Sequence, residues 1–233
     1  MDYLIHIDQQ WLLAINGWHA EWADILMWYV SKSTTWLPLY ALLVGFVVYK
    51  FGIQWYLSTQ DIPNSPNTPN YRYTALLRVF IVLAGFAVAV GLSDFISSGI
   101  IKPWVSRLRP THEPALAGML HLVNGYTGGM YGFVSSHAAN TMACALLFSL
   151  LYRNKYATVG LMLWVALNCY SRMYLGVHYP ADIIGGLAIG ALMATLTYGM
   201  VRRLVERVDE RSEGAGASCR WPEGDEDYPT ADS

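Results

Sequence analysis

Three short stretches of this chain carry residues suited to chemistry on a phosphate ester. They are KPWVSRLRP at residues 102–110, SSH at residues 135–137 and SRMYLGVHYPAD at residues 171–182. Cations and hydroxyl groups can hold a phosphate anion, while histidine and carboxylate groups can supply a nucleophile and an acid. The residues expected to take part are Lys102, Arg109, Ser135, Ser136, His137, Arg172, His178 and Asp182. The sequence therefore predicts cleavage of a phosphate ester in one pocket, with no metal and no cofactor.

His178 and Asp182 are four residues apart, where a proline indicates the start of a helix. Because Pro180 suits the first position of a helix, Asp182 is expected in the first turn. Its carboxylate can then accept a hydrogen bond from one ring nitrogen of His178, which leaves the other nitrogen free to attack phosphorus. His137 is expected to protonate the leaving oxygen and later to activate water. The predicted intermediate is a phosphohistidine.

The other candidates form a predicted anion-binding cradle. Arg109 and Arg172 offer planar guanidinium groups that suit phosphate oxygens, and Lys102 adds a compact charge on a flexible side chain. Ser135 and Ser136 stand at the start of an apolar segment, where the free N–H groups and the dipole of a helix favour an anion. We expect these five residues to bind the substrate phosphate.

The segments that must position these residues are long and apolar. Hydrophobic residues make up 54% of the 233 residues and charged residues only 14%, against about 25% in soluble domains. Five apolar segments approach the ~20 residues that cross a bilayer as a helix. They are 36–51, with a start near Ala23 as the alternative, then 75–101, 134–152, 157–177 and 181–201. The sequence therefore predicts an all-α fold, a polytopic transmembrane helical bundle of five to six spans with the catalytic residues at helix ends on one face.

The chain divides into three parts. Residues 1–22 mix polar and apolar side chains, which favours a helix in the membrane interface, with a sixth spanning helix as the alternative. Residues 23–207 are expected to form the transmembrane bundle, with the motifs inside a core of residues 75–205. Residues 208–233 are rich in Asp, Glu and Gly and predict an acidic, disordered tail. Within the bundle, residues 60–73 hold three prolines and three asparagines and predict an exposed loop.

Positive charges gather at one set of helix ends. Eight lysine and arginine residues lie at the ends away from the motifs, against four at the motif ends. The eight are Lys50, Arg72, Arg78, Arg153, Lys155, Arg202, Arg203 and Arg207. Because short cytoplasmic loops are enriched in such residues, the motifs are expected to face outward. In a bacterial cell this places the protein in the inner membrane with its active site facing the periplasm.

Together the three stretches resemble the signature of the type 2 phosphatidic acid phosphatase superfamily. The matching residues are Lys102, Arg109 and Pro110 for K-x6-R-P, Ser135 and His137 for x-S-x-H, and Ser171, Arg172, His178 and Asp182 for S-R-x5-H-x3-D. The resemblance implies a helical bundle, a metal-independent phosphohistidine mechanism, lipid phosphate or diphosphate substrates, and inhibition by vanadate.

The chain departs from that signature at two positions. The family's second motif is usually P-S-G-H, whereas here Val134 replaces the proline and Ser136 replaces the glycine. Val134 lacks the fixed φ of proline at the helix start, which is expected to loosen the cradle. Because all the ionisable residues are present, we expect the chemistry to remain.

The resemblance leaves the substrate open. A phosphorylated membrane lipid is the expected partner, reached sideways between helices, and no nucleic acid is expected. The candidates are undecaprenyl diphosphate, phosphatidylglycerol phosphate, phosphatidic acid and the phosphates of lipid A, with undecaprenyl diphosphate or a broad specificity favoured. The alternatives are a lipid phosphotransferase, a catalytically impaired member that binds or transports a phosphorylated lipid, and a channel. The sequence defines no oligomeric state.

A few further residues carry expectations. Asp94, inside the second apolar segment, is expected to bond to neighbouring helices, with charge balance for the cations as the alternative. Asn140 is expected to join helices, and Arg107 to assist in binding the lipid head group. The histidines of the long connection at residues 109–133 match no strong metal-site spacing. Three glycines indicate close helix packing, namely Gly185, Gly186 and Gly190.

Overall fold

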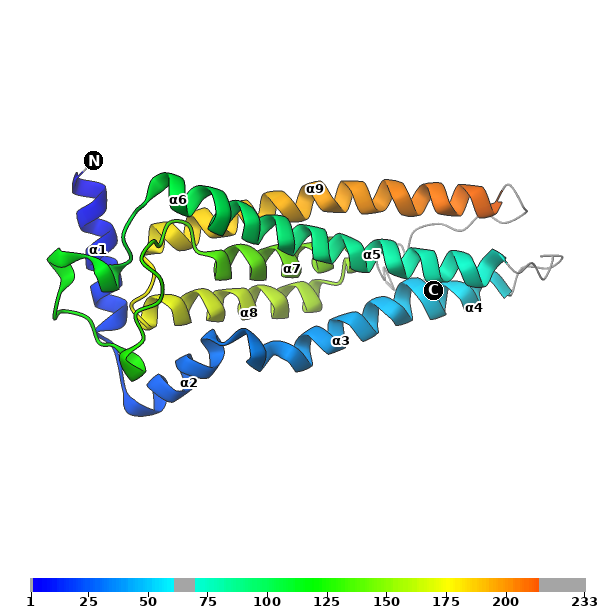
Figure 1. Cartoon of the computed structure of the whole chain (residues 1–233). Helices are drawn as coiled ribbons and strands as arrows, with labels where there is room; N and C mark the ends of the chain where they lie inside the picture. The colour runs from blue at the N-terminus through cyan, green and yellow to red at the C-terminus, as the bar shows by residue number, and fades with distance from the viewer. Residues whose placement is uncertain (1, 61–69, 214–233) are drawn as a thin grey trace, which may run out of the picture.

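The chain folds into an elongated bundle of helices (Figure 1). The computed structural model describes residues 2–60 and 70–213. Within these ranges the backbone forms no strand beyond an isolated bridge between Leu108 and Tyr131, so the predicted all-α fold is confirmed. The greater part of the predicted exposed loop, residues 61–69, and the acidic tail from residue 214 lie outside the described residues.

Three helical stretches of the described chain are long and apolar enough to cross a membrane. They are Ser33–Thr59, Tyr71–Val105 and Pro180–Ser212. The first consists of η1 (Ser33–Trp36), α3 (Leu37–Val47), η2 (Val48–Gln54) and α4 (Trp55–Gln60), the second of α5 (Asn70–Asp94), η3 (Phe95–Ile101) and α6 (Lys102–Val105), and the third lies in α9 (Pro180–Glu213). In each stretch the helix continues through its named parts, so each runs from one end of the bundle to the other (Figure 1).

Helices α7 (Ser136–Tyr152) and α8 (Lys155–Tyr174) complete the bundle. Helix α7 lies at its centre, in contact with α5, α8 and α9, and contributes to both large clusters of buried apolar side chains. Since its neighbours cover it, α7 needs few lipid-facing side chains, and its 17 residues fall short of the ~20 that span a bilayer. The count of five to six spans therefore stays a prediction.

Glycines allow α9 to approach α7 closely. A Cβ atom at Gly186 would lie 2.4 Å from the carbonyl oxygen of Ser135, and one at Gly190 would lie 2.2 Å from that of Ala139. Both distances are far below a normal contact, so these positions accept only glycine without a shift of the backbone. The packing role expected of these glycines agrees with this geometry.

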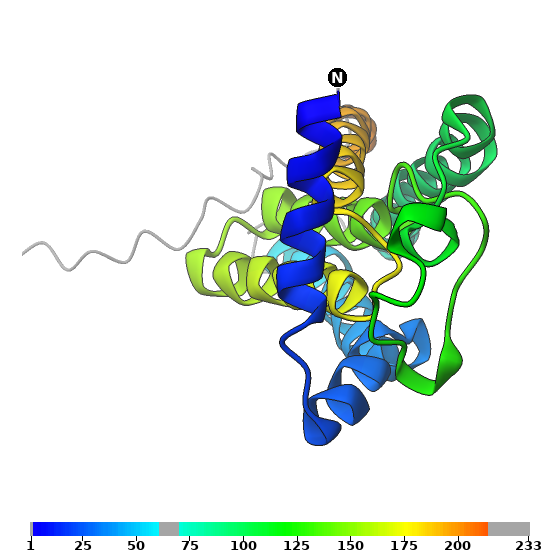
Figure 2. The same ribbon diagram turned by 90° about the vertical axis from the view of Figure 1, so that its left-hand side faces the viewer.

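The N-terminal part forms two shorter helices. Helix α1 (Asp2–Asn16) lies crosswise over one end of the bundle, as Figures 1 and 2 show. This position favours the interfacial helix over a sixth span, although its place in a membrane stays a prediction. Helix α2 (Glu21–Ser31) ends at Lys32, whose extended backbone separates it from η1. The first long stretch therefore begins at Ser33 and not near Ala23.

The last helix is longer than the sequence indicated. Helix α9 continues past residue 201 to Glu213, so residues 208–213, assigned to the acidic tail, are helical. The side chain of Asp209 explains the extension, because it pairs with Arg78 of α5 in a largely buried contact. A buried carboxylate paired with a guanidinium gives these turns a tertiary partner that hydrophobicity alone does not reveal.

Candidate active site

The three motif stretches meet at the end of the bundle that α1 crosses (Figure 1). Lys102 stands near the end of the second long stretch, and α7 begins at Ser136. Helix α8 ends two residues after Arg172, and α9 begins two residues after His178. A connection with three short turns, η4 (Pro110–His112), η5 (Pro114–Leu116) and η6 (Val123–Gly125), lies over this end. The up-and-down course of the chain thus gathers residues that are far apart in sequence.

His178 and Asp182 form a buried pair. Nδ1 of His178 lies 3.3 Å from Oδ2 of Asp182, and both side chains are almost fully buried. The same carboxylate oxygen accepts a hydrogen bond from the backbone N–H of Tyr179 at 3.0 Å. With Nδ1 donating to the carboxylate, the proton is fixed on that nitrogen, and Nε2 keeps its lone pair. The pair has the arrangement that the i, i+4 spacing predicts.

The surroundings of His178 favour its neutral form. Burial lowers the pKa of this imidazole well below its usual value, and the positive charges of Arg109, Arg172 and Lys102 lower it further. A neutral imidazole is the form that can act as a nucleophile. The cations that can bind a phosphate therefore also hold the ring in its reactive state.

A second set of contacts holds Asp182 through the carboxylate oxygen that His178 does not contact. Nη1 of Arg107 donates to Oδ1 of Asp182 at 3.1 Å, and Nη2 of Arg107 donates to Oδ2 of Asp8 at 2.6 Å. Asp8 lies on α1 and also accepts from the backbone N–H of Ala181 at 2.9 Å. The guanidinium stacks over the ring of Tyr179, 4.0 Å from its centroid. Arg107, expected to assist in head-group binding, links α1 to the carboxylate of the His178–Asp182 pair.

Lys102 points at the first turn of α7. Its Nζ donates to Oγ of Ser136 at 2.5 Å and lies 3.4 Å from Oγ of Ser98. The two hydroxyl groups are themselves 2.7 Å apart. One ammonium and two hydroxyl groups thus stand together where an anion could replace some of their mutual hydrogen bonds.

Ser135 lies next to Ser136 and caps the start of α7. It is fully buried, and as the N-cap of α7 its hydroxyl lies 3.5 Å from the backbone nitrogen of Ala138. Its own backbone N–H donates to the carbonyl of Asp182 at 2.9 Å. Ser135 therefore fixes the start of α7 against α9, while Ser136 presents its hydroxyl to Lys102.

Arg109 is held rigidly with part of its guanidinium unused. Its Nε donates to the carbonyl of Tyr131 at 3.2 Å, and its backbone N–H donates to that of Met130 at 2.9 Å. Its Nη1 is buried, and no acceptor for it is found among the described residues. A Cβ at Gly128, where φ is +69°, would lie 2.4 Å from that Nη1. Buried donors are normally satisfied, so this one is available to a ligand such as a phosphate oxygen.

Arg172 shows the same feature from another side. This buried side chain donates through Nη1 to Oγ of Ser31 in a close contact and through Nη2 to the Tyr126 hydroxyl at 3.4 Å. Its Nε is buried and has no acceptor in the described part of the chain. The predicted cradle thus contains two guanidinium groups, each with an unused buried donor.

His137 stands in the first turn of α7, on the wall of a cavity of about 320 Å³ that Arg172 and Tyr126 also line. The ring is partly buried. The positive charge of Arg172 and the His178 ring are close enough to act on it electrostatically. It therefore lies beside the cradle, with open volume next to it.

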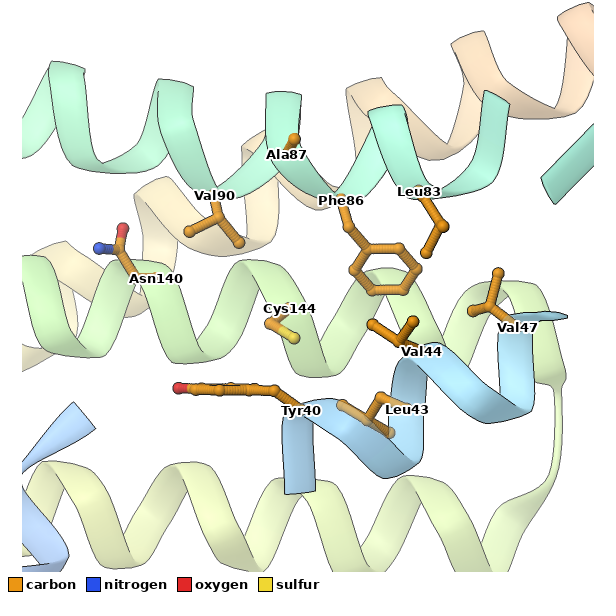
Figure 3. Close-up of a pocket in the computed structure, with 10 residues that line it drawn as sticks. All are labelled: Tyr40, Leu43, Val44, Val47, Leu83, Phe86, Ala87, Val90, Asn140 and Cys144. Carbon is orange, nitrogen blue, oxygen red and sulfur yellow. The ribbon is translucent and has the colours of Figure 1, made fainter. Parts of the chain in front are cut away.

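A second cavity, of about 520 Å³, lies deeper, between α3, α5 and α7 (Figure 3). Its wall consists of Tyr40, Leu43, Val44, Val47, Leu83, Phe86, Ala87, Val90, Asn140 and Cys144. It is almost wholly apolar. Asn140 and the hydroxyl of Tyr40 stand at one end, and Asn140 lies one helical turn after Ser136.

Asn140 also provides a hydrogen-bond partner for Asp94, the carboxylate inside the second long stretch. Its Nδ2 donates to Oδ1 of Asp94 at 3.0 Å, which joins α7 to α5 as expected of both residues. Among the described residues there is no group of three or more His, Cys, Asp or Glu side chains placed to hold a metal ion. In the long connection, His121 instead contacts Asp24 at 2.8 Å and stacks on His19.

Sequence reasoning named the motif residues but not the residues that hold them. Asp8, Ser31, Ser98 and Tyr126 contact motif side chains and were not singled out. Asp8 and Ser31 belong to N-terminal helices with no pattern that links them to the motifs. The position of Ser98 could have been predicted from the sequence, because it precedes Lys102 by one helical turn.

The chain is similar to known proteins over most of its length. Residues 73–206 match the family model described as the PAP2 superfamily. The chain is 30% identical over 226 residues to a lipid A 4'-phosphatase of Bacteroides thetaiotaomicron, covering 96% of this chain and 90% of that protein. It is 32% identical over 219 residues to a lipid A 4'-phosphatase of Porphyromonas gingivalis, covering 94% and 80%.

A solved structure shares the fold. It is the PAP2-type phosphatidylglycerolphosphate phosphatase of Bacillus subtilis, with a TM-score of 0.58 over 88% of this chain and 89% of that one. The two sequences are 19% identical, so the likeness concerns the fold alone.

Proposed function

Because this chain belongs to the PAP2 superfamily of membrane phosphatases, we propose that it hydrolyses a phosphate monoester of lipid A through a phosphohistidine intermediate. The observation that carries the chemistry is the buried His178–Asp182 pair among three cations. The two relatives similar over nearly the whole chain favour lipid A over undecaprenyl diphosphate, the lipid favoured on the sequence alone.

In the first step, Nε2 of His178 attacks the phosphorus atom. The N–P bond forms as the bond from phosphorus to the lipid oxygen breaks, and that oxygen takes a proton from His137. The ring of His178 becomes positively charged, and the carboxylate of Asp182 stabilises it through Nδ1–H. Lys102, Arg109, Arg172 and Ser136 hold the phosphate oxygens, with Ser135 fixing the helix end behind them.

In the second step, a water molecule loses a proton to His137 and attacks phosphorus. The N–P bond breaks, inorganic phosphate leaves, and both histidines return to their first states. None of these steps requires a metal ion.

The apolar cavity supports the choice of a lipid. It begins one turn below Ser136 and continues along α5 and α7 away from the motif end (Figure 3). An acyl chain in it would place a head group at the cradle while remaining in contact with the membrane interior. This is the sideways entry expected from the sequence.

The basic residues also bear on how the bundle is oriented in the membrane. Lys50, Arg153, Lys155 and the arginines of α9 lie at the end of the bundle opposite the motifs. On the charge bias of cytoplasmic loops, we propose that the motif end faces the periplasm of a bacterial inner membrane.

The test is phosphate release from lipid A, undecaprenyl diphosphate, phosphatidylglycerol phosphate and phosphatidic acid by the purified protein in detergent with EDTA. We expect release from lipid A and its loss in His178→Ala, with His112→Ala, a histidine in the connection, as the control. Activity that persists in His178→Ala would disprove the nucleophile, and activity abolished by EDTA would disprove the metal-free mechanism. Phosphate that appears on a second lipid and not in solution would identify a phosphotransferase. No release from any lipid would favour a binding or transport protein.

A further inference from the structure

The cavity beside His137 has a second wall without a role in the chemistry above. On one side it is lined by His137, Arg172, Tyr126 and Leu175. On the other side lies the junction between α2 and η1, which contributes Trp28, Ser31, Lys32, Ser33 and Thr34. We call residues 31–34 the junction segment. Its backbone is extended at Lys32 and continues into η1, and all four of its residues line the cavity.

Apart from Ser31, which accepts from Arg172, the junction segment carries polar side-chain groups that make no hydrogen bond or ion pair within the described part of the chain. The hydroxyl groups of Ser33 and Thr34 have no hydrogen-bond partner in the described part of the chain, and the ammonium of Lys32 has no carboxylate there. All three residues are exposed. The ammonium rests over the rings of Trp28 and Tyr29, 4.9 and 5.3 Å from their centroids. One cation, two hydroxyl groups and an aromatic side chain therefore stand together at an open volume.

We propose that this cavity binds the phosphorylated sugar ring of the substrate lipid. Lys32, Ser33 and Thr34 bind the oxygens of the ring and its substituents, and Trp28 supplies an apolar contact to its carbon atoms. A volume of about 320 Å³ lies at the small end of ordinary ligand sites and suits one sugar ring.

The position of His137 indicates on which side of the cradle the leaving group lies. The leaving oxygen must lie within hydrogen-bond reach of the group that protonates it, so the leaving group extends into the space next to His137. That space is the cavity, and the junction segment forms its far wall. Arg172, on the near wall, marks the phosphate side.

The two cavities differ in the way that the two parts of a glycolipid differ. The cavity between α3, α5 and α7 is apolar and suits an acyl chain (Figure 3). The cavity at the junction segment carries a cation and hydroxyl groups and suits a sugar. A polyprenyl diphosphate has no sugar and would leave the junction segment unused, so this segment is a determinant of specificity for phosphate carried on a sugar.

The inference rests on the proposed function, and its test compares two substrates. The variants are Lys32→Met and the double variant Ser33→Ala with Thr34→Val. Thr35→Val is the matched control, because Thr35 is exposed on the same turn but does not line the cavity. For each protein, kcat/KM is measured with lipid A and with undecaprenyl diphosphate in detergent, and folding is checked by size-exclusion chromatography and thermal unfolding.

We expect each junction variant to lose at least about fivefold in kcat/KM for lipid A, since each lost hydrogen bond costs roughly 1 kcal/mol, which corresponds to about a fivefold change. The values for undecaprenyl diphosphate and for Thr35→Val should stay unchanged. Equal losses on both lipids, or no loss on lipid A, would overturn the inference while the phosphatase proposal stands. A parent protein that cleaves undecaprenyl diphosphate but not lipid A would overturn the sugar site together with the proposed substrate. A parent that cleaves neither would refute the proposed function itself.

Discussion

Arg107 donates to Asp182 at the carboxylate oxygen that His178 does not contact. The Nη1–Oδ1 distance is 3.1 Å, and the other end of the same guanidinium reaches Asp8 on α1. The carboxylate is therefore fixed from two sides, by the ring that it orients and by an arginine behind it. Because both terminal nitrogens of Arg107 already contact carboxylates, we assign this residue a positioning role.

Replacement of Arg107 should slow the chemical step more than it weakens binding. In Arg107→Lys a single ammonium cannot bridge both carboxylates, so Asp182 loses its fixed orientation. A hydrogen bond between charged groups is worth about 1.5–3 kcal/mol, so we expect kcat to fall roughly 10- to 100-fold with KM little changed. Steady-state kinetics on lipid A check this, with Arg202→Lys on the exposed far end of α9 as the control. A rise in KM at constant kcat would indicate head-group binding instead.

The neutral state of His178 predicts a loss of stability in acid. Its folded pKa is well below the usual value because of burial and the three cations, while the unfolded chain binds a proton at a pH of about 6.5. Above that pH both states are neutral, and below it only the unfolded state gains the proton. We therefore expect stability to fall by about 1.4 kcal/mol per pH unit below about 6.5 from this group alone.

The measurement is thermal unfolding in detergent between pH 5 and 7.5. His178→Gln should have a shallower pH dependence than the parent, and His6→Gln, an exposed position on α1, should match the parent. Parallel curves for the parent and His178→Gln would contradict the lowered pKa.

Substitution of two glycines in the long connection distinguishes backbone strain from a steric clash with the predicted phosphate cradle. Gly128 and Gly118 both have positive φ, +69° and +76°, so alanine strains each backbone by a similar amount. Only at Gly128 does the new Cβ meet Arg109, at 2.4 Å from Nη1. We expect Gly128→Ala to weaken vanadate inhibition and to raise KM by about tenfold, the equivalent of one displaced charged hydrogen bond. Gly118→Ala should do neither, and equal behaviour of the two would remove Arg109 from the phosphate site.

A glycine pair on α9 tests the packing of the bundle core. At Gly190 a Cβ would lie 2.2 Å from the carbonyl oxygen of Ala139 on α7, whereas at Gly199 a Cβ would have no described neighbour outside its own turn within 4 Å. We expect Gly190→Ala to lower the unfolding temperature, at a cost of about 1–3 kcal/mol for overpacking. Gly199→Ala should be neutral or stabilising by up to about 1 kcal/mol, because alanine favours helix. Similar unfolding temperatures for the two variants would mean that α7 and α9 pack less closely.

The sequence was sufficient to predict which side chains meet at the motif end. Their positions at the ends of apolar segments define one face of an up-and-down bundle, and the i, i+4 spacing defines the His178–Asp182 pair. It was insufficient for contacts that depend on how helices pack. Asp8 and Ser31 reach the site only because α1 lies crosswise and α2 ends beside Arg172.

Charge was the least reliable guide. Arg107 and Arg109 are two residues apart and chemically identical, yet Arg107 joins two carboxylates, whereas Arg109 keeps a buried donor for which the described residues offer no acceptor. Periodicity cannot distinguish them, because the intervening backbone is irregular. The helical ending of α9 was missed for a related reason, since the buried pair of Asp209 with Arg78 is a tertiary contact.

The contact between Asp8 and the backbone N–H of Ala181 has a consequence for biogenesis. The two residues are separated by 173 positions, so a ribosome makes Asp8 long before it makes Ala181. Asp8 and Arg107 cannot complete the support of Asp182 until α9 has emerged and been inserted. A nascent chain therefore lacks the supported His178–Asp182 pair until α9 has been made, and a chain that stops before α9 never acquires it.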